Sequence, residues 1–223
     1  MNRQKVLIMM LVAFMLFCFN GGGFAAVSAA SKNTILLSAA SPFEDLTEYA
    51  LAANWDGMNR ALKAYFEQAV EVRKVLSAKA REDLAASIAA IEKSVGRRDN
   101  ETVALKSVEA YRILIDALDK NLLVVPVQVA LLDYAGFVST VLSHFQSATD
   151  WPALEKAAAE AARNWAAIRD RVADKGLRDA VDTAIAGLHK AAIDKNLAMA
   201  IFAAQIDLAL VDLLEGYFEP VSK

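Results

Sequence analysis

The sequence predicts an all-α protein, and three observations carry this prediction. After the first thirty residues, alanine, leucine, lysine and glutamate dominate, and alanine and leucine have the highest helix propensities. Proline and glycine, which interrupt helices, are scarce over the same region. Apolar residues recur at steps of three and four, and no stretch shows the sustained period-two alternation of a half-buried strand. We therefore expect a helical bundle.

Residues 1–30 form a segment of a different kind. Arg3 and Lys5 give it a basic start, an unbroken apolar run covers residues 6–19, and small residues surround Ala29 and Ala30. This order is typical of a cleavable secretory signal peptide. The apolar run is also short for a helix that spans a membrane. We expect cleavage near Ala29 or Ala30 and a periplasmic or secreted protein.

Composition limits the chemistry of the exported protein. Cleavage would remove two of the 24 basic residues and none of the 27 acidic ones, so the mature net charge is near −5 and nucleic acid is not an expected partner. Cys18 is the sole cysteine and lies in the signal peptide, which excludes disulfides and thiolate chemistry. Catalytic serine motifs and phosphate-binding glycine loops are absent, and His144 and His189 are too few to suggest a metal centre. We expect no enzymatic activity, no cofactor and no metal site.

The first predicted repeat covers residues 31–126. A capping box at residues 41–44 predicts the start of a short leading helix. Three longer helices follow. Their expected N-caps are Asn54, Ser77 and either Asp99 or Asn100, because these side-chain oxygens can accept the unpaired N–H groups of a first turn.

The second predicted repeat, residues 127–223, carries the same apolar spacing. Trp151 follows Asp150 as Trp55 follows Asn54, and the helix after each tryptophan has the same stripe at an offset of 96 residues. The next helix repeats at an offset of 97 and the last at 95. We interpret this as a tandem duplication of about 95 residues in which the two repeats share one core. The alternative is that the match is coincidental, because any two amphipathic helical segments can be placed in register.

Two segments are apolar along nearly their whole length. For residues 122–142 three interpretations are open: a buried central helix, a surface for homodimer or peripheral membrane contact, and a transmembrane helix. In residues 197–214, Asp207 has apolar neighbours at helical spacing, so we expect it to be buried and either paired or protonated. At the offset of 95 it takes the place of Arg112, which suggests an ion pair between the two side chains.

The candidate ligand-binding residues are aromatic side chains that could line the seam between the repeats, together with one buried acid. They are Trp55, Tyr111, Trp151, Trp165 and Asp207. Aromatic residues at helix starts more often seal the ends of a bundle core than contact a ligand. We expect the protein to act by binding a small apolar ligand or a protein partner at this seam. Two alternatives stay open: a structural or envelope-associated protein that oligomerises through residues 122–142, and a metal- or haem-binding bundle.

Overall fold

The computed structural model describes residues 28–145 and 150–219, and these residues form a bundle of eight α-helices without any strand. Two 3-10 helices, η1 (Lys120–Leu122) and η3 (Arg169–Arg171), lie in connections. The α-helices are α2 (Ala29–Leu51), α3 (Trp55–Val75), α4 (Ala78–Arg97), α5 (Asn100–Asp116), α6 (Val127–His144), α7 (Trp151–Ile168), α8 (Lys175–Asp194) and α9 (Leu197–Phe218). The predicted all-α class is confirmed.

The expected signal peptide falls on residues 1–27, outside the described residues, and on the first residues of α2. This helix begins at Ala29, where the side chain of Ser28 accepts the N–H of Ser31 as an N-cap. The expected cleavage site therefore coincides with the start of the first described helix. Cleavage there would remove the cap and leave the buried face of α2 intact.

Most helix starts lie where the sequence predicts them. The side chains of Asn54, Ser77 and Asp99 accept backbone N–H groups of the following turn at 3.0–3.2 Å. Asp150 and Asp174 do the same at 3.0 Å. Each bond satisfies one of the four N–H groups that a helix leaves unpaired at its start. These boundaries are local, which is why residues close together in the sequence reveal them.

The leading helix departs from the prediction. The motif at residues 41–44 does not start a helix, because α2 begins at Ala29 and runs through Pro42 for 23 residues. Proline has no N–H, so the carbonyl of Ser38 loses its partner within the helix. The side-chain amide of Gln68, on α3, donates to that carbonyl at 3.4 Å, and the Ser38 hydroxyl donates to Gln68 at 2.7 Å. A neighbouring helix thus compensates for the break that the proline introduces.

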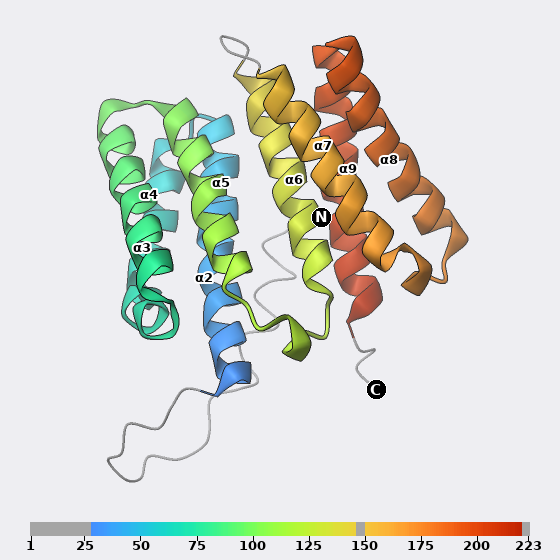
Figure 1. Cartoon of the computed structure of the whole chain (residues 1–223). Helices are drawn as coiled ribbons and strands as arrows, with labels where there is room; N and C mark the ends of the chain where they lie inside the picture. Colours follow the sequence, from blue (N-terminus) through green and yellow to red (C-terminus); the bar gives the residue numbers. More distant parts are fainter. Residues whose placement is uncertain (1–27, 146–149, 220–223) are drawn as a thin grey trace.

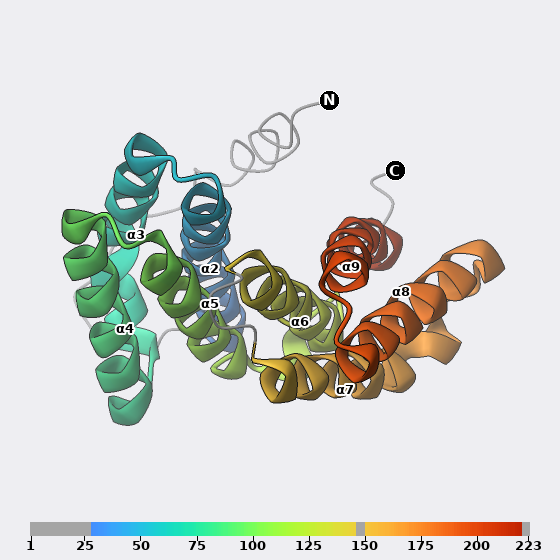
Figure 2. The same cartoon turned by 90° about the horizontal axis from the view of Figure 1, so that it is seen from above.

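The helices form two groups of four that lie side by side, α2–α5 and α6–α9 (Figure 1). In each group the first helix packs against the second and the fourth, and the third packs against the fourth. The groups meet mainly through α5 and α6. Figure 2 shows α6 between α5 on one side and α7 and α9 on the other.

The two groups share a core. The largest buried cluster contains side chains of α2 to α5 and also Val127, Phe137 and Val141 of α6. The opposite face of α6 contributes Val129 and Leu132 to a second cluster with α7, α8 and α9. Because α6 is buried on both sides, it is the central helix of the bundle, as one of the three interpretations of residues 122–142 expects. That segment is not one helix, since α6 begins only at Val127.

Candidate functional site

The structure does not bring the five predicted site residues together. Trp55 and Trp151 begin α3 and α7 and are partly buried against different core clusters. Trp165 is buried in the cluster of α7 and α8, whereas Tyr111 belongs to the largest cluster, beside α6. Asp207 lies on α9 against α6. These residues therefore do not line one pocket at the seam, and the tryptophans act as core packing.

Asp207 is buried as the sequence predicts, but it has no ion pair with Arg112. Its side chain is 1% exposed, and its Oδ2 atom has no hydrogen-bond partner. That oxygen lies against Gly136 of α6, where a Cβ added to the glycine would stand only 2.9 Å from it. Burial raises the pKa of Asp207 to about 7. Arg112 instead binds Asp116 at 2.8 Å and Glu160 of α7.

A second group of carboxyl groups lies where α2, α5, α6 and α9 approach one another. Burial, followed by the charge of Asp133, raises the pKa of Glu44 well above its usual range. Burial, followed by the charge of Glu215, likewise raises the pKa of Asp133, and a hydrogen bond with Tyr111 opposes this shift. The Tyr111 hydroxyl also donates to the carbonyl of Ala130 at 3.3 Å. Both carboxyl groups therefore keep a proton to higher pH than a solvated acid does.

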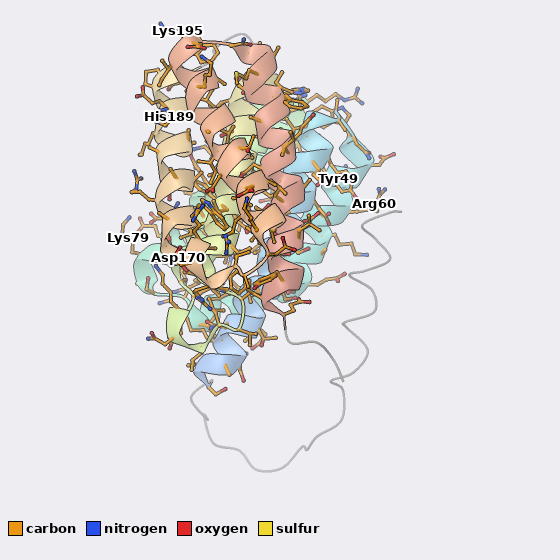
Figure 3. The ribbon with its side chains drawn as sticks, turned by 90° about the vertical axis from the view of Figure 1, so that its right-hand side faces the viewer. Tyr49, Arg60, Lys79, Asp170, His189 and Lys195 are labelled. Atoms are coloured by element: carbon orange, nitrogen blue, oxygen red, sulfur yellow. The ribbon has the colours of Figure 1, made fainter. Side chains whose placement is uncertain are left out.

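The two histidines are exposed and belong to different helices. His144 ends α6 and packs edge-to-face on Phe145, with 4.8 Å between ring centroids. His189 is on the exposed surface of α8, on the half of the bundle that faces the viewer in Figure 3. Within the described ranges, no group of three or more histidine, aspartate or glutamate side chains is arranged to hold a metal ion.

A groove that the sequence does not predict lies between α3 and α4. It encloses about 140 Å³, close to the ~150 Å³ of an engineered apolar cavity that binds benzene. Tyr65 and Phe66 supply aromatic surface from α3, and Leu84 and Ile88 supply aliphatic surface from α4. Helices α3 and α4 touch each other far less than α7 and α8 do. This separation leaves room for a ring-sized group.

One end of this α3–α4 groove is cationic. Arg73, in the last turn of α3, and Arg81, near the start of α4, both line it and are exposed. Neither guanidinium has an ion-pair partner within residues 28–145 and 150–219. Tyr65 is 2% exposed, and its hydroxyl makes no hydrogen bond with any described residue. Burial raises the pKa of Tyr65, and the nearby charge of Arg73 opposes this shift.

The corresponding place between α7 and α8 is filled. At the offset of 96, Trp165 of α7 corresponds to Ala69 of α3, which lines the groove. At the offset of 97, Asp182 of α8 corresponds to Ala85, which also lines it. Trp165 is 3% exposed and its indole N–H donates to Asp182 at 2.6 Å. The two alanines that line the groove at these offsets are smaller than Trp165 and Asp182.

The arrangement is suited to binding. Apolar walls remove a ring from water, and guanidinium groups attract an anion through charge-assisted hydrogen bonds. The exchange of Ala69 for Trp165 is visible in the sequence, and it is the one signal that could have revealed the groove.

Comparison of the chain with protein-family models, with curated proteins and with solved structures gave no match.

Proposed function

We propose that this protein is an exported helical-bundle binding protein whose binding site is the α3–α4 groove. The observation that carries the proposal is a ring-sized space with aromatic and aliphatic walls, left open in one half of the bundle and filled by Trp165 in the other. Small-molecule sites are usually concave and mostly apolar, with a few polar groups that orient the ligand. A small apolar ligand fits this description better than the exposed surface of a protein partner, because the groove holds only about 140 Å³.

Export is supported by residues 1–30, whose basic start, apolar run and small residues match a signal peptide. The test is cell fractionation of the full chain, followed by measurement of the mass of the recovered protein. We expect a soluble periplasmic or secreted protein that begins near Ala29 or Ala30. Recovery of the uncleaved chain from the cytoplasm would contradict export and would leave the groove proposal intact.

A tandem duplication is part of the proposal, and matching turns support it. Arg98 and Lys195, 97 residues apart, both follow a helix and both adopt a left-handed conformation, with φ of 58° and 52°. The next residues, Asp99 and Asn196, cap α5 and α9 in the same way. These matching turns and caps favour an offset of 97 for the last helices over the 95 expected from the sequence. At this offset Asp207 matches Ala110 of α5 and not Arg112.

The binding proposal is tested by filling the groove. Ala69→Trp introduces the side chain that occupies the second half, and Ala86→Trp, at an exposed position of α4 outside the groove, is the matched control. Binding of indole and toluene is followed by ligand-observed NMR. We expect both rings to bind the parent and Ala86→Trp proteins and not Ala69→Trp. Equal binding to all three would contradict a site between α3 and α4.

A second candidate function is association with the envelope, and a specific observation on α9 favours it. Its 22 residues have a mean hydropathy of 2.0 over the most apolar window, and only 33% of that window is buried. Phe202 and Leu213 are 65% and 59% exposed. Flotation with vesicles of phosphatidylethanolamine and phosphatidylglycerol tests this role. Loss of flotation in the Phe202→Ser/Leu213→Ser variant would support it, and a parent protein that stays with the soluble fraction would contradict it.

A further inference from the structure

We infer that the ligand of the α3–α4 groove is a small aromatic acid, with a single ring and one carboxylate. This inference rests on the proposed function and names the chemistry of its ligand. It is drawn from a comparison of the open groove with its filled counterpart between α7 and α8.

The filled counterpart shows which groups belong together. Trp165 places an indole ring between α7 and α8, and its N–H donates to Asp182 at 2.6 Å. Arg169 holds the same carboxylate through three hydrogen bonds of 2.7–3.1 Å. Hydrogen bonding to Arg169 is the main reason that the pKa of Asp182 is lowered, and the charge of Arg178 acts in the same direction. The fold thus accommodates one ring and one carboxylate that Arg169 binds directly. The Arg178 guanidinium donates to the carbonyl of Val172 at 2.6 Å and acts on the carboxylate only through its charge.

The open groove keeps the arginines and lacks the other two groups. Arg73 corresponds to Arg169 at the offset of 96, and Arg81 corresponds to Arg178 at the offset of 97. The ring and the carboxylate are replaced by Ala69 and Ala85. Two cationic groups therefore face a space from which both the ring and the negative charge are missing. A ligand that supplies both would restore the arrangement seen in the other half.

The polarity of the groove fixes how such a ligand would lie. Arg73 and Arg81 stand at the end near the α3–α4 turn. Glu92 lines the opposite end, eleven residues beyond Arg81 on α4 and hence about 16 Å away. Its charge disfavours a second carboxylate there. The ring would lie over Ala69, in the place that Trp165 occupies in α7, and its acid group would point to the arginines.

The experiment compares three probes on the protein purified from cells that express the full chain. Phenylacetate has the ring and the charge, phenylacetamide keeps the ring without the charge, and hexanoate keeps the charge without the ring. Dissociation constants are measured by two-dimensional NMR titration at pH 7, with amide shifts of groove residues as the readout. We expect phenylacetate to bind at least tenfold more tightly than either of the other probes.

Variants assign the effect to the groove. Arg73→Gln changes an exposed side chain and is expected to remove the preference for phenylacetate over phenylacetamide while ring binding persists. Lys63→Gln, which removes an equal charge from an exposed position of α3 outside the groove, should leave the preference unchanged. Ala69→Trp/Ala85→Asp rebuilds the ring and carboxylate of the second half, so it should abolish binding of all three probes and raise the melting temperature.

The outcomes separate this inference from the function on which it rests. Equal affinity for phenylacetate and phenylacetamide would overturn the aromatic acid and retain an apolar binding groove. Equal affinity for phenylacetate and hexanoate would show that the ring is not recognised and would also overturn it. Shifts confined to residues outside the groove, or none with any probe at millimolar concentration, would overturn both the inference and the binding function.

Discussion

Replacing Asp207 by asparagine should remove a specific pH dependence of folding. The aspartate is 1% exposed on α9, and its Oδ2 atom has no partner beside Gly136. Burial disfavours the charged form and raises its pKa from the ordinary 3.8 to about 7. In the unfolded chain the same carboxyl group is solvated and titrates near its ordinary value. The folded state therefore binds this proton more tightly than the unfolded state does.

The magnitude follows from the difference between the two pKa values. A shift of about three units, at ~1.4 kcal/mol each, corresponds to about 4 kcal/mol. Because the folded-state pKa of this acid is raised, its contribution to stability is complete below pH ~4 and is lost as the pH rises towards ~7. The asparagine side chain of the variant does not titrate in either state. We therefore expect the parent protein to lose about 4 kcal/mol more stability than Asp207→Asn between pH 4 and pH 8.

Other acids near the seam do not obscure this difference. Glu44 and Asp133 also have raised pKa values, so both proteins should lose stability with rising pH for that reason. The charge of Asp207 is one of the causes that raise the pKa of Asp133, so the variant should also show a slightly weaker dependence from Asp133. The comparison between the two proteins isolates the contribution of residue 207 and its effect on this neighbour.

The assay is urea unfolding followed by far-UV circular dichroism at five pH values from 4 to 8. Glu67→Gln, which changes an exposed carboxylate on α3, serves as the matched control and should follow the parent curve. Parallel stability profiles for the parent and Asp207→Asn would refute the reasoning, because they would show that the buried carboxyl group takes up no extra proton on folding.

Three further predictions concern packing and capping, and all are measured as changes in the free energy of unfolding by urea. Trp165→Phe should cost about 2 kcal/mol, since it removes the indole hydrogen bond to Asp182, and an unchanged value would contradict a role for that bond. Gly136→Ala should cost about 2 kcal/mol, because its Cβ would stand 2.7 Å from a leucine side chain, whereas Gly96→Ala, with open space around it, should be neutral or stabilising by up to ~1 kcal/mol. Asp150→Ala should cost about 1 kcal/mol through loss of the α7 N-cap, and an effect below ~0.3 kcal/mol would argue against the cap.

The leading helix shows where sequence reasoning falls short. A proline after a serine, with a glutamate two residues later, is a sound local signal for a helix start, and it predicts the wrong boundary for α2. The helix continues through Pro42 because Gln68, 26 residues further along the chain, donates to the freed carbonyl of Ser38. A hydrogen bond between two helices cannot be read from the residues around the proline.

The candidate site, too, could be predicted from the sequence only in part. The sequence places aromatic residues at similar positions in two repeats, and a seam between the repeats is a reasonable place for them to meet. In the structure Trp55, Trp151 and Trp165 pack into separate clusters, because each fills the space beside its own helix neighbours. The groove instead arises where Ala69 and Ala85 are small, and small residues give little warning of a binding site until the two halves are compared.

The sequence by itself determined the helical class, most helix starts and the burial of Asp207, because helix propensity, capping and apolar spacing act over one or two turns of chain. Only the tertiary structure decided that α6 is the central helix, that Arg112 binds Asp116 and Glu160, and that α3 and α4 stand apart. These features depend on how large and small side chains from distant segments fill shared space. That volume is a property of the assembled helices and not of any one of them.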